Sequence, residues 1–469
     1  ESAGIAVSDG NRIVVHKEMG LVAQVFDEPA LTALRGHIAV GHCRYSTTGA
    51  STWANAQPTF RSTGTISLAL GHNGNLINTR ELAGLLSGLP EGFPGGRGPG
   101  STGIEATSDT DVLTALFVSD PAAFGPADVA VPGGAADTDG PFGPQPPASA
   151  VETTAATVLP LAKGAYSLVF MDEQTLYAAR DPHGFRPLVL GRLDTGWVVA
   201  SETAALDIVG ARFVREIAPG ELVCVDGRGV RSRTFAAAQP SGCLFEYVYL
   251  ARPDTTISGR GVHATRVAAG RRLAAEHPAD ADLVIPVPES GTPAAIGFAE
   301  ASGIPFGQGL VKNSYVGRTF IQPSQTIRER GIKLKLNPLR DAIAGRRLVV
   351  VDDTIVRGTT QRALVAMLRE AGAREVHVRV AAPPVSWPCF YGIDFATRAE
   401  LIAGHLSPEQ ICASIGADTL GYVSLAGLIE ATTLPEDRLC RACFDGRYPV
   451  PVGEDDRGKH VLDGLGVGS

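Results

Sequence analysis

The stretch LVVVDDTIVRGTT, residues 348–360, decides the fold of the C-terminal half of this chain. Four apolar residues end in two carboxylates, and a glycine-containing loop then leads into TTQRALVAMLREAG, which has the spacing of an amphipathic helix. The same alternation occurs earlier, in DLVIPVP followed by TPAAIGFAEA, and EVHVRVAA adds a further strand. Apolar strands that alternate with helices predict an α/β domain with a parallel sheet.

The loop after this strand has the chemistry of a phosphate site. Ligands of open α/β sheets bind beyond the carboxyl ends of the strands, and the N–H groups at the next helix N-terminus favour a phosphate. We expect loop 354–359 to hold a 5-phosphate, while Asp352 and Asp353 accept hydrogen bonds from the vicinal hydroxyls of a ribose. The pattern resembles the signature of type I phosphoribosyltransferases over its whole length. The loop residues concerned are Thr354, Arg357, Gly358 and Thr359.

Two further segments belong to this expected site. The strand and loop LVIPVPESG, residues 283–291, would present Ser290 and Gly291 to a pyrophosphate. Between the two loops, a basic segment carries a single acid, Glu329, and would close over a polyanion and neutralise it. The alternative for such a charge run is a solvated basic loop. Its basic residues are Lys312, Arg318, Arg328, Arg330, Lys333 and Lys335.

The N-terminal half has a different pattern. Short β-rich runs separated by glycine turns over residues 38–76 and 166–225 predict packed antiparallel sheets, and GIAVSDGNRIVV (4–15) predicts two strands joined at an Asp-Gly turn. The Gly-, Pro- and Ala-rich stretches near 88–101 and 120–150 predict flexible insertions. We therefore expect one domain over 1–235, a second over 236–448 and a tail over 449–469.

Three short motifs in the N-terminal half carry polar residues in a fixed order. They are Arg44 in GHCRYSTTG (41–49), Asn73 and Gly74 in GHNGN (71–75), and Asp109 in TSDTDVL (107–113). Each has a structural alternative: a surface ion pair for the arginine, a hairpin turn for Asn-Gly, and a helix N-cap for the aspartate.

Four of the seven cysteines, all in the C-terminal half, are candidate ligands of a metal or cluster: Cys243, Cys389, Cys440 and Cys443. The C-x-x-C pair at 440–443 is ambiguous between zinc, an iron–sulfur cluster and free thiols. We expect the remaining three, Cys43, Cys224 and Cys412, to be small buried apolar residues.

Taken together, these motifs resemble those of the amidophosphoribosyltransferases over nearly the whole chain. The resemblance implies a class II, Ntn-type glutaminase sandwich followed by a type I phosphoribosyltransferase domain. It also implies formation of 5-phosphoribosylamine and pyrophosphate from phosphoribosyl pyrophosphate (PRPP) and glutamine-derived ammonia, the first committed step of de novo purine biosynthesis.

The resemblance assigns roles to residues. Arg44 would bind the α-carboxylate of glutamine, Asp109 its amino group, and Asn73 with the Gly74 N–H would form the oxyanion hole. Ser290, Asp352 and Asp353 would hold magnesium with PRPP, and Lys312 and Arg318 would belong to a catalytic loop over it. The four cysteines would carry a [4Fe–4S] cluster. Feedback inhibition by purine nucleotides and a homotetramer are further implications.

The family's nucleophile is an N-terminal cysteine, and no such residue opens this sequence, since Glu1-Ser2-Ala3-Gly4 corresponds to a segment after it. Cys43 is no substitute, because it lacks a free α-amine. We therefore expect ammonia-dependent turnover only. Either the sequence is a fragment, which we favour, or glutamine hydrolysis has been lost.

Composition excludes some functions. A net charge of −8 and a pI near 5.7 argue against nucleic-acid binding, and the absence of a long apolar run favours a cytoplasmic protein without a membrane partner. Three alternatives remain open: a PRPP-sensing regulatory protein without turnover, a nucleobase phosphoribosyltransferase and a cluster-dependent redox sensor.

Overall fold

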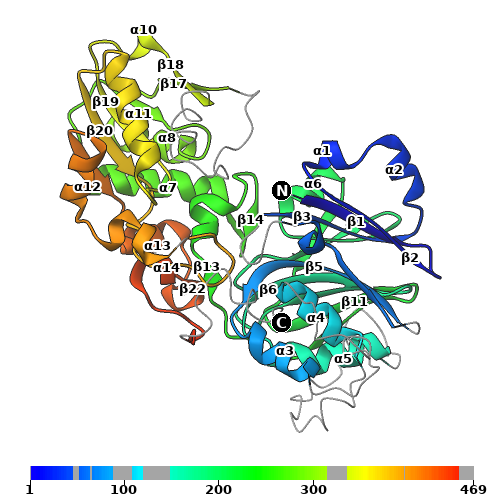
Figure 1. Cartoon of the computed structure of the whole chain (residues 1–469). Coiled ribbons are helices and arrows are strands. Elements are labelled where there is room, and N and C mark those ends of the chain that lie inside the picture. Colours follow the sequence, from blue (N-terminus) through cyan, green and yellow to red (C-terminus); the bar gives the residue numbers. More distant parts are fainter. Residues whose placement is uncertain are drawn as a thin grey trace, which may run out of the picture. The chain divides into compact units, whose positions relative to one another are not determined.

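The computed structural model of this chain describes residues 2–45, 52–63, 66–87, 108–119, 148–313, 335–395 and 397–453. These form two compact units (Figure 1): unit 1 comprises Glu1–Gly242, Phe390–Asp394 and Pro449–Ser469, and unit 2 comprises Cys243–Cys389 and Phe395–Tyr448. The insertions expected near 88–101 and 120–150 lie outside the described residues, apart from the last three positions, where Ser149 caps a helix that begins at Ala150.

Unit 1 contains the antiparallel sheets that the sequence predicts. The largest has the order β12-β11-β7-β6-β5-β4, and two three-stranded sheets have the orders β2-β1-β3 and β10-β8-β9. The Asp-Gly turn expected near the N-terminus is confirmed, because Gly10 joins the first two strands with a φ of 96°. The strands are β1 (Ser2–Ser8), β2 (Ile13–Met19), β3 (Ile38–Arg44), β4 (Thr59–Ser62), β5 (Ser67–Leu76), β6 (Gly164–Met171), β7 (Leu176–Arg180), β8 (Val189–Leu193), β9 (Gly196–Ala200), β10 (Arg212–Glu216), β11 (Glu221–Asp226) and β12 (Gly229–Thr234).

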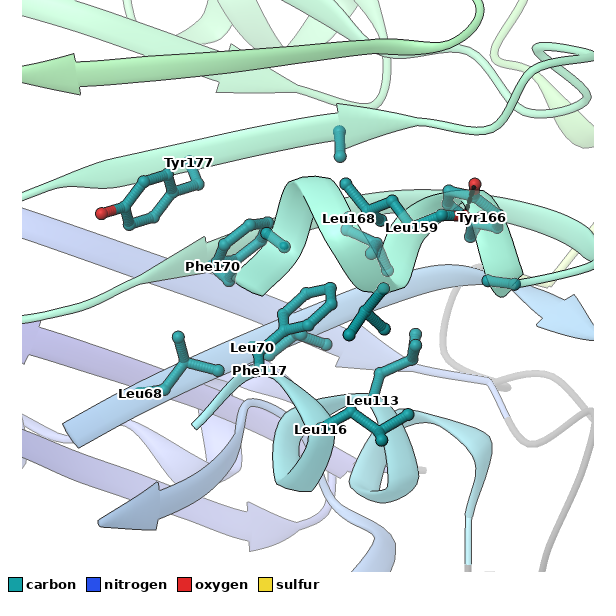
Figure 2. Close-up of a cluster of buried hydrophobic side chains, with 14 of the residues drawn as sticks. Leu68, Leu70, Leu113, Leu116, Phe117, Leu159, Tyr166, Leu168, Phe170 and Tyr177 are labelled. Carbon is teal, nitrogen blue, oxygen red and sulfur yellow. Dashed lines mark hydrogen bonds between the residues drawn. The ribbon is translucent and has the colours of Figure 1, made fainter. Parts of the chain in front are cut away.

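The alternation of side chains along β5 explains how unit 1 is layered. Leu68 and Leu70 point into a core shared with helices α4 and α5, whereas Ala69 packs with Ala6 and Val40 of the β1–β3 sheet. Figure 2 shows side chains of α4 meeting those of β5 and β6. The helices of unit 1 are α1 (Val22–Val25), α2 (Glu28–Ala33), α3 (Thr79–Ser87), α4 (Asp109–Phe117), α5 (Ala150–Val158) and α6 (Thr203–Ile208).

Aromatic rings fill the centre of this core. The ring of Phe170 lies 5.1 Å from that of Phe117 and 4.8 Å from that of Tyr177, centroid to centroid (Figure 2), and all three side chains are buried. Burying side chains of this size stabilises a fold by about 2–3 kcal/mol each. The core therefore fixes β5 and α4, which carry the predicted glutamine-site residues Asn73, Gly74 and Asp109.

Unit 2 contains the predicted parallel sheet, with the order β16-β19-β20-β21. Its central strand β19 (Arg347–Asp352) is buried along nearly its whole length, as a strand covered by helices on both faces must be. The other sheet strands are β16 (Leu283–Pro286), β20 (Glu375–Val380) and β21 (Thr419–Tyr422). The helices are α7 (Val262–Glu276), α8 (Thr292–Ser302), α10 (Arg340–Ile343), α11 (Thr359–Glu370), α12 (Pro408–Ile415), α13 (Leu425–Thr432) and α14 (Ala442–Asp445).

Short elements complete unit 2. Strand β17 (Leu310–Lys312) pairs with β18 (Leu336–Pro338), and β14 (Thr256–Ile257) pairs with β15 (Arg260–Gly261). Strands β13 (Gly242–Cys243) and β22 (Leu439–Cys440) carry two of the candidate cysteines, and the 3-10 turns Arg398–Glu400 and Ile402–Gly404 follow one another. No helix within the described ranges is long and apolar enough to cross a membrane.

Candidate active site

The predicted phosphate loop lies between β19 and α11. Asp352 ends the strand, Asp353 follows it, and Gly358, with a φ of 76°, is the N-cap residue before α11. The backbone N–H of Asp353 donates to Asp352 Oδ1 (2.9 Å), and the hydroxyl of Thr354 donates to Asp353 Oδ1 (2.5 Å). Thr354, Arg357, Gly358 and Thr359 therefore all lie on the turn that leads to the N-terminus of this twelve-residue helix, where a phosphate is favoured.

The two carboxylates are buried side by side. Burial raises the pKa of Asp352 well above its ordinary value, and the neighbouring charge of Asp353 raises it further. Burial likewise raises the pKa of Asp353, although hydrogen bonds from Ser290 and Thr354 oppose the shift. Both groups are oxygen ligands, and a divalent cation would relieve the repulsion between them. The pair therefore fits magnesium, which binds one or two carboxylates together with substrate phosphates.

The second predicted loop meets the first. Strands β16 and β19 are parallel neighbours, and the N–H of Val287 donates to the carbonyl of Val351 (2.8 Å). Ser290 and Asp353 line the same small cavity, and hydrogen bonding to Ser290 lowers the pKa of Asp353. A β-carbon at Gly291 would lie 2.5 Å from the carbonyl oxygen of Val351, so only glycine fits there. Ser290 and Gly291 therefore lie beside the two aspartates.

The basic segment is described only at its ends. Lys312 is the last residue of β17, and its Nζ lies 3.4 Å from the carboxylate of Glu289 in the second loop. Arg318, Arg328, Arg330 and Lys333 lie outside the described residues. Lys312 is thus next to the predicted pyrophosphate loop, and the expected closure of the segment over it stays a prediction.

In unit 1, the structure brings the Asn73-Gly74 motif and Asp109 together. Both motif residues lie in β5, and the Asp109 carboxylate, at the start of α4, accepts a hydrogen bond from the N–H of Leu76 two residues further along that strand (3.1 Å). Gly74 has a φ of 150°, and a β-carbon there would lie 2.1 Å from the Ala165 carbonyl oxygen. Glycine is therefore required at this position.

The structural alternatives for the three motifs are resolved. Arg44, at the end of β3, is only 7% exposed and is therefore no surface residue. Asn73 and Gly74 lie within a ten-residue strand and not in a hairpin turn. The N-cap of α4 is Ser108, whose side chain accepts a hydrogen bond from the N–H of Asp111, and Asp109 is the residue after it.

His72 was missed by the sequence reasoning, although it lies inside the GHNGN motif. It is buried, and its Nδ1 lies 3.5 Å from Asp109 Oδ2. Burial alone would lower the pKa of His72, but the charge of Asp109 and the hydrogen bonds to Asp109 and Ala165 raise it. Burial alone would raise the pKa of Asp109, but the charge and hydrogen bond of His72 and backbone N–H groups lower it. The two side chains form a buried pair in which both pKa shifts favour the ionised forms.

His42 links the strand of Arg44 to the same motif. Its Nε2 lies 3.1 Å from the carbonyl oxygen of His72. Burial lowers the pKa of His42 to about 4, so the ring is neutral at neutral pH. The sequence alone does not show whether a histidine in such a motif makes a structural contact, as His42 does, or takes part in catalysis.

Residues 390–394 are a second contribution that the sequence did not reveal. They belong to unit 1 although both flanks belong to unit 2. The side-chain amide of Asn75 donates to the carbonyl of Phe390 (3.0 Å), and Gly392 packs against the backbone of Gly74. The ring of Tyr391 stacks on Phe185 with centroids 4.3 Å apart. This short segment therefore supports the predicted oxyanion element.

The four candidate cysteines come from three segments of unit 2 that are joined by backbone hydrogen bonds. Leu244 N–H donates to the carbonyl of Cys440 (3.0 Å), while the N–H groups of Ser386 and Trp387 both donate to that of Cys443 (3.1 Å each).

The thiols also affect one another. Burial raises the pKa of Cys440 and of Cys443 well above the ordinary value, and the charges of Cys243 and Cys389 raise both further. Four sulfur ligands fit an iron–sulfur cluster or zinc. Within the described part of the chain, no group of three or more His, Cys, Asp or Glu side chains is arranged to hold a single metal ion.

Known proteins are similar to this chain over nearly its whole length. The amidophosphoribosyltransferase of Mycobacterium tuberculosis (strain H37Rv) is 58% identical over 99% of this chain and 83% of its own length. The chain belongs to the amidophosphoribosyltransferase family. The enzyme of that name from Synechococcus elongatus is 48% identical over 99% of this chain and 88% of its own length. A family model for a glutamine amidotransferase domain matches residues 147–207.

Two solved structures are also similar to this chain. Glutamine PRPP amidotransferase from Bacillus subtilis, complexed with ADP and GMP, superposes with a TM-score of 0.83 at 42% identity and covers 98% of this chain and 94% of that one. A structure of the allosteric regulatory enzyme of purine biosynthesis gives a TM-score of 0.84 at 42% identity, covering 98% and 92%. The predicted fold, a glutaminase-type unit followed by a parallel-sheet phosphoribosyltransferase unit, is confirmed.

Membership of the amidophosphoribosyltransferase family also decides the class of activity. The chain is an enzyme of the pentosyltransferase class, and the first step of purine biosynthesis is its reaction. A PRPP-sensing protein without turnover is not favoured.

Proposed function

We propose that PRPP binds with magnesium between the loop at 288–291 and the loop at 352–359, and that ammonia displaces pyrophosphate there to give 5-phosphoribosylamine. One observation carries this proposal: Ser290, Asp352 and Asp353 lie together at the carboxyl ends of two adjacent parallel strands, next to the N-terminus of α11. Ligands of open α/β sheets bind at that edge.

Each part of the site has a role in this reaction. The turn before α11 holds the 5-phosphate through backbone N–H groups, and the two carboxylates orient the ribose hydroxyls. Bound magnesium would neutralise the leaving pyrophosphate. Lys312, held beside Glu289, extends a cation to the same side. The chain's contribution is therefore positioning and charge stabilisation, with no covalent intermediate.

We propose that unit 1 binds glutamine. Arg44 binds the α-carboxylate through the bidentate geometry of a guanidinium, and Asp109 accepts from the amino group. The side-chain amide of Asn73 and the N–H of Gly74 stabilise the oxyanion. The support is the placement of Asp109 directly beside β5 and the buried position of Arg44.

We also propose an iron–sulfur cluster and feedback control by nucleotides. The convergence of Cys243, Cys389, Cys440 and Cys443 supports a [4Fe–4S] cluster, with structural zinc as the alternative. The nucleotide complex of the Bacillus subtilis relative supports feedback control by purine nucleotides. A homotetramer and a cytoplasmic location follow from the family resemblance alone. Metal analysis of anaerobically purified protein tests the cluster, because zinc without iron would overturn it.

The transferase site is tested by pyrophosphate release from PRPP with magnesium, with ammonium and glutamine as separate nitrogen donors. Changing both Asp352 and Asp353 to Asn should nearly abolish release with ammonium, while the exposed control Asp341→Asn retains it. Retained turnover in the double variant would remove the assignment. Comparing the two donors shows whether unit 1 of this chain supplies ammonia.

A further inference from the structure

A short segment packs directly against the predicted phosphate loop. Residues 398–404, which we call the brace segment, consist of two consecutive 3-10 turns. The N–H of Ile402 donates to the carbonyl of Val356 (2.9 Å), and the carboxylate of Glu400 lies 3.1 Å from the guanidinium of Arg357. A β-carbon at Gly358 would lie 2.7 Å from the Ile402 side chain, so this side chain fills the space beside the glycine.

The brace segment is itself anchored on a rigid aromatic side chain. The guanidinium of Arg398 lies over the ring of Trp387, 4.0 Å from its centroid. The hydroxyl of Ser386 donates to the carbonyl of Ala403 (3.2 Å), which fixes the second turn. The negative face of the tryptophan ring attracts the guanidinium, and this cation–π interaction holds Arg398 in place.

Trp387 is held in turn by the cysteine-bearing part of unit 2. Its backbone N–H donates to the carbonyl of Cys443 (3.1 Å), and its ring lies where a β-carbon at Gly446 would come within 2.7 Å. The side-chain hydroxyl of Tyr448 donates to the carbonyl of Pro388 (2.7 Å). A continuous series of contacts therefore runs from α14 through Trp387 and the brace segment to Val356 and Arg357.

We infer that Arg398 and Glu400 are positioning residues for PRPP: they hold the phosphate loop in the conformation that binds the 5-phosphate. The inference rests on the proposed function of that loop. Gly358 has a positive φ, and the residues before it contact the brace segment through Val356 and Arg357. These contacts help to hold the loop with its N–H groups in the orientation that binds a phosphate. A loop that must be ordered by its ligand binds that ligand more weakly.

The test measures KM for PRPP and kcat with ammonium as nitrogen donor, and the binding of PRPP with magnesium by calorimetry, on the full chain. Arg398→Ala and Glu400→Gln should each raise KM and the dissociation constant about two- to fivefold, with kcat nearly unchanged. Arg398→Lys should restore most of the affinity, because it keeps a cation over Trp387.

An exposed ion pair elsewhere in unit 2 provides the matched controls. Arg271 and Glu300 join α7 to α8 at 2.7 Å, with side chains about as exposed as those of Arg357 and Glu400. Arg271→Ala and Glu300→Gln should leave KM for PRPP unchanged. Equal effects in brace and control variants, or a loss confined to thermal stability and kcat, would overturn the positioning role.

The variants distinguish a wrong role for the brace segment from a wrong location of the PRPP site. If the Asp352 and Asp353 double variant is inactive while Glu400→Gln keeps the wild-type KM, the site stands and the brace role falls. If Arg398→Ala does not fold, Glu400→Gln still decides, because its side chain is about half exposed and its replacement keeps the same shape.

Discussion

Replacing Gly291 by alanine should impair PRPP turnover far more than it impairs folding. The added β-carbon would lie 2.5 Å from the Val351 carbonyl oxygen and 2.9 Å from that of Val287, whereas ordinary contact begins at 3.4 Å. The loop must therefore retreat from β19 by 3.4 − 2.5, or about 0.9 Å. Ser290, the adjacent residue, would move away from Asp353 with it. A misplacement of about 1 Å costs up to 100-fold in rate.

We therefore expect kcat/KM for PRPP, measured with ammonium, to fall by about 10- to 100-fold in Gly291→Ala. Overpacking costs about 1–3 kcal/mol, so the melting temperature should fall by only about 2–12 °C. Gly261→Ala is the control in the same unit, because its added β-carbon would lie 4.0 Å from that of Ala264, an ordinary contact distance. A Gly291→Ala enzyme within twofold of the wild type would refute the tight packing of the two loops as the basis of the site.

Four variants of unit 1 give further expected outcomes. Gly74→Ala should destabilise the unit by about 3 kcal/mol because of its positive φ and the clash with Ala165, whereas Gly84→Ala, in open space on α3, should stabilise it by about 0.5–1 kcal/mol; both are read by calorimetry. Phe170→Ala should cost about 3–5 kcal/mol in urea unfolding. Asp109→Asn should lower stability by about 3–5 kcal/mol, most strongly between pH 3.8 and 6.5.

The pH window for Asp109→Asn follows from the directions of the two shifts. The pKa of Asp109 is lowered on folding, so its stabilisation is present above 3.8 and is lost as the pH falls through the folded value. The pKa of His72 is raised, so its stabilisation is complete below 6.5 and is lost as the pH rises through the folded value. A stability difference that stays constant from pH 4 to 9 would show that the pair is not ionised.

The sequence predicted the phosphoribosyl half in detail because its chemistry is local. Strand, carboxylates, turn and helix follow one another within 348–360, so the fold places them side by side without help from distant residues. The same holds for the second loop at 283–291, which the parallel sheet brings to the same edge. The order of strand, loop and helix predicted that Asp352, Asp353 and Ser290 lie at one edge of the sheet, whereas their roles were assigned by the resemblance to phosphoribosyltransferases.

Contacts between segments far apart in sequence were not predictable in this way. His72 pairs with Asp109, and Glu400 pairs with Arg357, but one charged residue in a sequence does not indicate which distant partner it faces. Residues 390–394 lack any apolar period that would assign them to unit 1. The structure describes the basic segment only up to residue 313 and again from residue 335, so the roles of Arg318 and its neighbours stay predictions.

Residues 390–394 belong to unit 1 although the sequence on both sides of them belongs to unit 2. This arrangement matters when the two units are to be produced separately. A gene fragment encoding residues 1–242 would contain every strand of the glutaminase-type sheets, yet the amide of Asn75 would lose the Phe390 carbonyl and Phe185 would lose the ring of Tyr391. The excised half would thus have an open flank behind Gly74. Because the polypeptide crosses between the units more than once, neither half can be obtained intact by a single cut.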